Sequence, residues 1–239
     1  MDNGIYIALS RELGLFRDMD ATANNIANAN TAGYNAEHML FRSYLVKDDP
    51  RPRMAFAHDI ATFRRTDMGS LRTTGNALDI AIAGPGYFVV ETPLGERYTR
   101  AGNFQVDGRG VLITPDGYPV LDTAGQRIIF NEDDHDISIG EAGNLKVNGE
   151  DRAIIGVVEF GNEQLMERLS SSLFKTDEIP TLTETSRVVQ GVLEESNVQP
   201  VIELTHMMAI SREVSNTAKF IETMYDLQRK ASNTLARQS

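Results

Sequence analysis

The sequence predicts an α+β protein in which an antiparallel, all-β middle domain is inserted between N- and C-terminal helices that pair as a coiled-coil-like α domain. Two observations support this fold class. At both ends of the 239-residue chain, apolar or small residues recur at steps of three and four, the spacing of a helix that buries one narrow seam. Between the ends the period falls to two, and turn residues recur about every ten residues, as in meandering antiparallel strands.

The C-terminal seam is the most regular pattern in the chain. It consists of Met207, Ile210, Val214, Thr217, Ile221, Met224, Gln228, Ala231 and Leu235. A helix of about 29 residues spans about 43 Å at 1.5 Å per residue. Because a narrow seam needs a partner, we expect a second helix to pack against it.

The opening residues supply that partner. Residues 4–30 contain few helix breakers, and a similar rhythm runs through Ile5, Leu9, Leu13, Phe16, Ala23 and Ala27. We therefore expect this row to face the C-terminal seam. Gly33 follows the predicted helix and is well placed as its left-handed cap.

Four segments follow from these periods. Residues 1–35 form the N-terminal helix, 36–69 an extended arm or linker with room for one hairpin, 70–185 the all-β domain, and 186–239 a lead-in and the C-terminal helix. Asp107-Gly108 and Asn148-Gly149 are hairpin signals, because both central turn positions need positive φ. We expect strands at 77–83, 87–91, 97–100, 104–106, 111–114, 127–130, 137–139, 145–147 and 153–160.

Composition excludes several classes of protein. The net charge of −11 disfavours a nucleic-acid partner, since a phosphate backbone would be repelled. The absence of cysteine excludes disulfides, thiolate metal sites and cysteine nucleophiles. No secretory signal peptide is visible and the apolar runs are too short to span a bilayer. We therefore expect no direct membrane insertion, and either a cytoplasmic location or export without a cleavable signal.

The sequence carries no pattern that indicates catalysis. The acidic run at 132–136 lacks the ligand spacing and the glycine of a calcium-binding loop, so a solvated loop is the favoured interpretation. The four histidines have no ligand at metal-type spacing, and the serine-elbow, Walker-type and dinucleotide-binding patterns do not occur. We expect no enzyme, no metal and no cofactor.

Several stretches resemble a known family. Residues 23–34, which read Ala-Asn-Asn-Ile-Ala-Asn-Ala-Asn-Thr-Ala-Gly-Tyr, are similar to the signature at the N-terminal end of bacterial flagellar rod and hook proteins. Residues 74–88 and 98–104 resemble the start of that family's β domain, and Ser196-Asn197-Val198 resembles its second marker, before the last helix. The resemblance covers nearly the whole chain.

The resemblance implies a structural role. Such proteins form the rod, the drive shaft that crosses the periplasm and transmits torque from motor to hook, and they leave the cell unfolded through the flagellar type III export apparatus. Residues 1–6 and the modest length are most similar to a proximal-rod member, with a distal-rod subunit as the alternative. The implied partners are other rod proteins, copies of this chain and the export apparatus. A soluble β-domain binding module that dimerises through its helices is an alternative of another class.

The expected assembly interface combines the seams with the signature. We expect the terminal helices to pair and to pack beside those of neighbouring subunits, with the β domain outside. The residues of this interface are Leu9, Leu13, Phe16, Ala23, Ile26, Asn28, Asn30, Gly33, Tyr34, Met207, Ile210, Val214, Thr217, Ile221, Met224 and Leu235.

Overall fold

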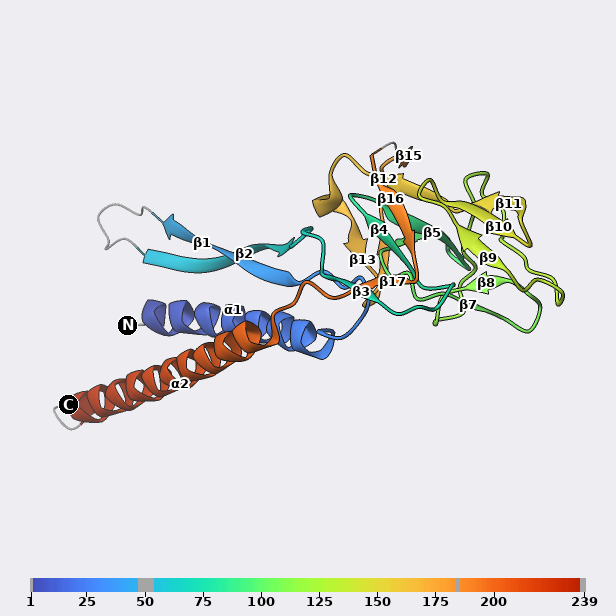
Figure 1. Ribbon diagram of the computed structural model, residues 1–239. Coiled ribbons are helices and arrows are strands. Elements are labelled where there is room, and N and C mark those ends of the chain that lie inside the picture. Colours follow the sequence, from blue (N-terminus) through green and yellow to red (C-terminus); the bar gives the residue numbers. More distant parts are fainter. Residues whose placement is uncertain (1, 47–53, 184, 237–239) are drawn as a thin grey trace. The chain divides into compact units, whose positions relative to one another are not determined.

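The chain folds as α+β, as the sequence predicts, with a helix near each end and a mostly antiparallel β region between them (Figure 1). This computed structural model describes residues 2–46, 54–183 and 185–236; the side chains of 2–4, 41–60, 231, 232 and 234–236 lie outside the description. The chain divides into two compact units. We call Met1–Ala27, Glu37–Arg65 and Gln199–Ser239 the helical unit, and Asn28–Ala36 and Thr66–Val198 the β unit.

The helical unit contains two helices and a β-hairpin. Helix α1 (Asp2–Ala27) packs against helix α2 (Pro200–Ala236) and against both strands of the hairpin, β1 (Glu37–Val46) and β2 (Met54–Arg64). The hairpin lies in the segment that was expected to be an extended arm or linker with room for one hairpin, and its antiparallel register shifts between Leu40 and Phe41. Helix α2 begins with a proline, which is tolerated there because the first helical N–H groups have no partner within the helix.

The β unit is built from short antiparallel strands. Its largest sheet has the order β13-β14-β6-β5-β12-β15, and a three-stranded sheet has the order β11-β10-β9. The pairs β16-β4, β17-β3 and β7-β8 complete the pattern, and a short 3-10 helix, Glu163–Leu165, precedes β13. The strands are β3 (Leu71–Thr73), β4 (Ile80–Ala83), β5 (Tyr87–Thr92), β6 (Gly95–Thr99), β7 (Gln105–Val106), β8 (Leu112–Ile113), β9 (Ile137–Ile139), β10 (Asn144–Val147), β11 (Glu150–Ile154), β12 (Val157–Glu159), β13 (Glu167–Arg168), β14 (Leu173–Lys175), β15 (Thr181–Leu182), β16 (Arg187–Gln190) and β17 (Val192–Glu194).

Strand β5 lies between the two largest hydrophobic clusters of the β unit. Because side chains alternate along a strand, Phe88 and Val90 enter one cluster while Tyr87 and Val89 enter the other. Phe88 packs edge-on against Phe104 with ring centroids 5.1 Å apart. These first four residues of β5 are all buried, so they read as a continuous apolar run in the sequence.

Two of the expected strands differ in the structure. The run 153–160 is divided: β11 pairs with β10, whereas β12 pairs with β5, in a different sheet. Gly156 lies between them, where an added Cβ would be 3.0 Å from the carbonyl oxygen of Asp122. The run 127–130 forms isolated bridges instead of a strand: Ile129 pairs with Val111 and Arg127 with Leu121. Asn148 and Gly149 do have positive φ, 53° and 85°, as a hairpin turn requires.

Candidate assembly faces

The seam of α2 is buried in the structure at the positions that its heptad spacing predicts. Between Leu204 and Lys230, the buried or half-buried residues are Met207, Ile210, Val214, Thr217, Ile221 and Met224, and the residues between them are exposed. Ile210 is 3% exposed. Gln228 is exposed, so among the described side chains the covered positions of the seam run from Met207 to Met224. The backbone of residue 235 is helical, but the Leu235 side chain lies outside the described residues.

The row expected on α1 points elsewhere, which corrects the sequence analysis. Leu9, Leu13 and Phe16 are 47%, 56% and 42% exposed, and Ala23 is also exposed. The buried positions of this helix are Ala8, Gly14, Asp18, Thr22 and Asn25. These side chains are small or polar, and small side chains let two helices approach closely. Three large apolar side chains of α1 are therefore exposed, while Leu15, Met19 and Ile26 are half-buried beside Ala8 and Thr22.

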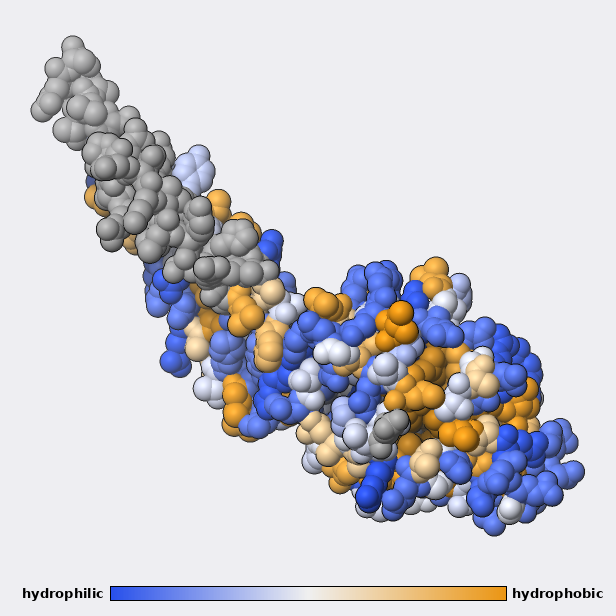
Figure 2. Space-filling view, turned by 90° about the horizontal axis from the view of Figure 1, so that it is seen from above, coloured by the Kyte–Doolittle hydropathy of each residue, from blue (hydrophilic) through white to orange (hydrophobic). Residues whose placement is uncertain are grey.

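Tyr6, Leu9, Leu13 and Phe16 form one row along the outside of α1, which we call the α1 row. Their spacing of three, four and three residues places them on one side of a helix with 3.6 residues per turn. Ala8 and Thr22 face α2 from roughly the opposite side. Apolar side chains are visible on the surface of the helical unit among polar ones (Figure 2). An apolar row on the outside of a helix indicates a surface that another chain covers.

Asn25 joins three elements of the helical unit. Its side chain is fully buried, its Oδ1 accepts a hydrogen bond from the Glu37 N–H at 3.0 Å, and its Nδ2 donates to the Glu37 carbonyl oxygen at 2.8 Å. The same Nδ2 lies 3.3 Å from Oε2 of Glu203, a buried residue in the first turn of α2. Asn25 thus links α1 to the start of β1 and to α2. The sequence analysis included this asparagine in the signature but did not predict these partners.

Two polar pairs cross between α1 and α2. Arg11 donates a hydrogen bond from Nη2 to Oε2 of Glu213 at 2.9 Å, with both side chains about half exposed. Nearer the Asn25 end, Nε2 of His206 lies 3.1 Å from Oδ2 of Asp18. The sequence analysis found no metal-type spacing around the histidines, and in the structure His206 bonds across the helix pair. Polar partners on both helices fix how far one helix can slide along the other.

A groove opens between the two helices beside the Arg11–Glu213 pair. It has a volume of about 580 Å³ and is lined by Ile7, Ala8, Arg11, Glu213, Asn216, Thr217 and Phe220. The aromatic ring of Phe220 is half exposed at its edge. The groove and the α1 row are thus different surfaces of the same unit.

The two markers of the signature meet within the β unit. The N–H of Asn197 donates to the Tyr34 carbonyl oxygen at 3.2 Å, and its Oδ1 accepts from the Ala36 N–H at 2.7 Å. Tyr34, Ala36 and Val198 form a small buried cluster. Asn28 is half-buried and accepts a hydrogen bond from the Thr31 hydroxyl, whereas Asn30 is exposed. Markers that lie about 160 residues apart in the sequence therefore form one joint.

Gly33 is left-handed, but it does not cap α1. The helix ends at Ala27, and Gly33, with φ of 64°, lies in the following segment, where its N–H donates to the Glu194 carbonyl oxygen at 2.9 Å. A Cβ at this position would lie 2.5 Å from the backbone carbon of Arg100. Glycine is needed here because the two backbones approach closely and because φ is positive.

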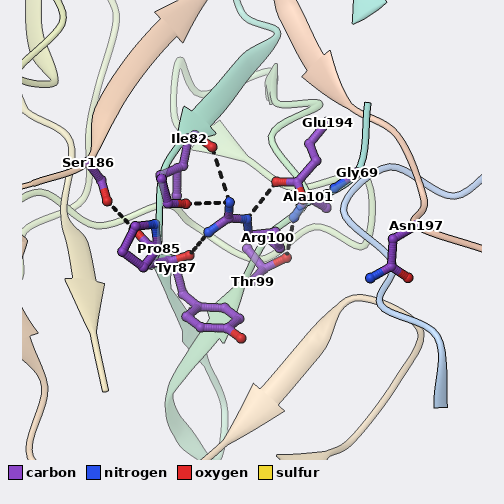
Figure 3. Close-up of polar contacts among 12 residues, drawn as sticks. Gly69, Ile82, Pro85, Tyr87, Thr99, Arg100, Ala101, Ser186, Glu194 and Asn197 are labelled. Atoms are coloured by element: carbon purple, nitrogen blue, oxygen red, sulfur yellow. Dashed lines mark hydrogen bonds and ion pairs between the residues drawn. The ribbon is translucent and has the colours of Figure 1, made fainter. Parts of the chain in front are cut away.

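A buried ion pair lies on the other side of this joint (Figure 3). Nε of Arg100 donates to Oε2 of Glu194 at 2.6 Å, and the Gly69 N–H donates to Oε1 of the same carboxylate at 3.0 Å. The guanidinium also donates to the carbonyl oxygens of Ile82, Gly84 and Gly86. Since both charged side chains are under 10% exposed, each depends on the other for compensation.

The described residues contain no cluster of three or more His, Asp or Glu side chains that could hold a metal ion. The acidic run at 132–136 is a turn region in which Asn148 Oδ1 accepts from the N–H groups of His135 and Asp136. Within the described helices, neither is apolar enough over a sufficient length to cross a membrane.

Three models of flagellar protein families match the chain. One described as "Flagella basal body rod protein" matches residues 6–35, one described as "Flagellar hook protein FlgE/F/G D1 domain" matches 81–147, and one described as "Flagellar basal body rod FlgEFG protein C-terminal" matches 189–234. The matches fall on α1 with the first marker, on the β unit, and on the second marker with α2. These matches, together with the paired terminal helices, define the chain as a structural subunit of the flagellar rod and hook class.

Full-length relatives define the family more narrowly. The chain is 35% identical to flagellar basal-body rod protein FlgF of Caulobacter vibrioides, with 99% of both chains covered, and 33% identical to FlgF of Mesorhizobium japonicum, with both chains covered completely. It is 30% identical to flagellar basal-body rod protein FlgG of Bacillus subtilis over 98% of this chain and 99% of the relative. The chain belongs to the flagellar basal-body rod proteins, as an FlgF-type member. These proteins are structural subunits of the rod, not enzymes.

Proposed function

We propose that this rod subunit occupies the proximal part of the rod and assembles there through its terminal helices. The observation that carries the proposal is the position of the α1 row. Leu9, Leu13 and Phe16 are 47%, 56% and 42% exposed in the subunit, which supports a neighbouring chain as the cover of this row. Burying three such side chains contributes several kcal/mol at about 25 cal/mol per Å² of apolar area.

Helix α2 offers a second apolar surface to neighbouring subunits. Leu204 and Met208 are about half exposed and lie one helical turn apart, on the side away from the α2 seam. The helical unit thus presents apolar side chains on the outer faces of both helices while a seam holds the pair together. A subunit with contacts on several sides is suited to a tube wall, because each wall position has neighbours on more than one side.

The finer partner assignments also belong to this proposal. We assign other proximal-rod subunits, copies of this chain and the distal-rod protein FlgG as the neighbours, and the flagellar type III apparatus as the route of export. The relatives named FlgG support a shared subunit design, since they align with 90–98% of this chain in two of the comparisons. The absence of cysteine is consistent with export as an unfolded chain.

Peptide mass spectrometry on detergent-extracted basal bodies tests the location. We expect this chain in the basal body at fewer copies than the most abundant rod subunit, because a short proximal segment needs few subunits. Recovery only from the cytoplasmic fraction would contradict the proposal. In that case, equilibrium sedimentation showing a tight closed dimer would support the alternative module that dimerises through its helices.

A further inference from the structure

A pocket lies within the β unit, beside the joint that the two markers form. Its volume is about 310 Å³, and all of its lining residues belong to the β unit. Clefts that hold ligands typically have volumes of about 300–1,000 Å³, so this one has room for a side chain or a small molecule. We call it the joint pocket, and its lining includes Asn35, Met68, Pro85, Tyr87, Arg100 and Glu163.

Asn35 brings an unsatisfied acceptor to the joint pocket. This residue is 5% exposed, and among the described residues nothing donates a hydrogen bond to its buried side-chain Oδ1. Its backbone is held in place, because its carbonyl oxygen accepts from Nη2 of Arg168 at 2.6 Å. A buried acceptor without a donor lowers stability, and buried polar side chains nearly always have a partner. The pocket therefore lacks an N–H or O–H group.

The charges of the lining indicate which kind of donor fits. Arg100 is compensated, since its guanidinium bonds to the Glu194 carboxylate and to three backbone carbonyl oxygens (Figure 3). Glu163 is the acidic residue of the lining, and its Oε2 accepts from the Tyr87 hydroxyl at 3.1 Å. A hydroxyl is neutral, so this bond leaves the carboxylate its negative charge. A neutral acceptor and a carboxylate in one pocket fit a cation that carries N–H donors, a guanidinium or an ammonium group.

The composition of the β unit favours the same partner. This unit contains 22 acidic and 10 basic residues, whereas the helical unit contains 12 acidic and 13 basic ones. An acidic unit repels other acidic surfaces and attracts basic side chains. Met68, which is 47% exposed, and the exposed Pro85 add apolar surface to the lining. The methylene stem of a lysine or arginine can pack on such a surface, which a bare cation does not need.

We infer that the joint pocket binds the basic side chain of a neighbouring protein chain, whose N–H groups donate to Oδ1 of Asn35 and to the carboxylate of Glu163. The contact belongs to the β unit and does not involve the terminal helices. The choice of a basal-body protein as the neighbour rests on the proposed function. The preference of the pocket for a cation with N–H donors does not rest on it, so the two parts are tested separately.

Two cations test the pocket in the purified full-length chain. Methylguanidinium and tetramethylammonium carry the same charge, but only methylguanidinium has N–H donors. Each is titrated at constant ionic strength into the ¹⁵N-labelled chain, and the side-chain amide signal of Asn35 is followed by NMR. We expect a saturable shift of this signal with methylguanidinium and none with tetramethylammonium.

A matched pair of variants tests the carboxylate. Glu163→Gln removes its charge and keeps an acceptor for the Tyr87 hydroxyl, and we expect methylguanidinium to bind this variant several-fold more weakly. Glu167→Gln removes the same charge at an exposed position outside the lining, and we expect it to bind as the unmodified chain does. Equal responses to the two cations, equal effects of E163Q and E167Q, or no shift at all would overturn the inference. The last outcome would mean that the pocket holds water only.

Cross-linking in basal bodies tests the source of the side chain. The chain has no cysteine, so Met68→Cys provides a single thiol at the pocket for a short photo-cross-linker. Ile129→Cys is the control, since Ile129 is 50% exposed and outside the lining. We expect M68C to attach to another chain next to a lysine or arginine, at a site that I129C does not label. Attachment only within its own chain, or to a segment without a basic residue, would overturn the inference. If the chain were absent from basal bodies, the proposed function would fail, while the NMR titration would still decide whether the pocket binds the cation.

Discussion

At the scale of single residues, the joint of the β unit depends on groups that are distant in the sequence. Glu194 accepts hydrogen bonds from Arg100 and from the Gly69 N–H through its carboxylate, and from the Gly33 N–H through its carbonyl oxygen. One residue thus holds three separate segments. Breaking such a buried pair by removing one partner leaves an uncompensated charge, which costs far more than the net value of the pair.

Glu194→Ala is expected to lower the free energy of unfolding by about 3–5 kcal/mol, because the guanidinium of Arg100 is then buried without its carboxylate. Urea unfolding of the purified chain measures this loss. The double variant R100M/E194M removes both charges. Its loss of free energy of unfolding is expected to be clearly smaller than the sum of the losses of the single variants R100M and E194M. Additive losses would mean that the two side chains act independently.

Gly33→Ala tests the close approach of the two backbones. The new methyl group would meet the Arg100 backbone at 2.5 Å in a residue with φ of 64°, so the joint must shift. Gly75→Ala is the matched control, since its φ is 76° and no atom lies within 4 Å of the added carbon. We expect Gly75→Ala to lower the free energy of unfolding by about 1 kcal/mol, from backbone strain alone. Gly33→Ala is expected to lower it by distinctly more, and thermal unfolding measures both losses. Equal losses would contradict the steric argument.

At the scale of elements, the two helices show what a periodic pattern can and cannot determine. The α2 seam could be predicted because the positions that are buried on this helix are the same positions that carry apolar or small residues. The pattern on α1 misled because the apolar residues Leu9, Leu13 and Phe16 lie on the outer face, whereas the inner face uses Ala8, Thr22 and Asn25. Periodicity locates a hydrophobic face but not the chain that covers it.

The sequence allowed for one hairpin in residues 36–69 but did not place its strands, and it did not indicate the polar joints. The segment 37–64 mixes charged with apolar residues, so its strands gave no clear alternation. Strands β13, β14 and β15 have two or three residues each, too few for a period to be recognised. The pairs Asn25–Glu203 and Arg100–Glu194 join residues 178 and 94 positions apart, and no local spacing indicates such contacts.

Asn25→Leu is expected to loosen the contact among α1, β1 and α2. The substitution removes the amide that bonds to the Glu37 N–H, to the Glu37 carbonyl oxygen and to the Glu203 carboxylate. Each buried group left without a partner costs about 1–3 kcal/mol of stability. Hydrogen exchange is expected to speed up in α1 and in the first turns of α2. The control N216L replaces an exposed asparagine and is expected to change stability by less than about 0.5 kcal/mol. Unchanged protection in N25L would refute this role.

At the scale of the whole molecule, the proposed function assigns folding and assembly to different faces of the same helix. The inner face of α1 holds the subunit together, and the outer row remains available for a neighbour. The two functions can therefore be separated by mutation, which would be impossible if one seam served both.

Leu13→Asp and Ile221→Asp are expected to differ in this respect. Leu13 is 56% exposed, so L13D leaves the free subunit stable within about 0.5 kcal/mol while abolishing its incorporation into the rod and swimming. Ile221 is half-buried in the α2 seam, so I221D puts a charge into the helix pair and destabilises the helical unit by several kcal/mol while the β unit stays folded. Circular dichroism with denaturant and a motility assay distinguish the two, and normal swimming by the L13D strain would refute the separation.

The pairing of β3 with β17 has a consequence for how such a chain can change. Val192 pairs with Thr73 and Glu194 with Leu71, while Nδ2 of Asn197 donates to the Asp67 carbonyl oxygen. The stretch 66–198 therefore leaves and re-enters the rest of the chain at adjacent points. Domains with neighbouring ends can be lengthened, shortened or replaced without moving the sequence on either side of them. A lineage can thus remodel this stretch by genetic exchange while the terminal helices keep their contacts.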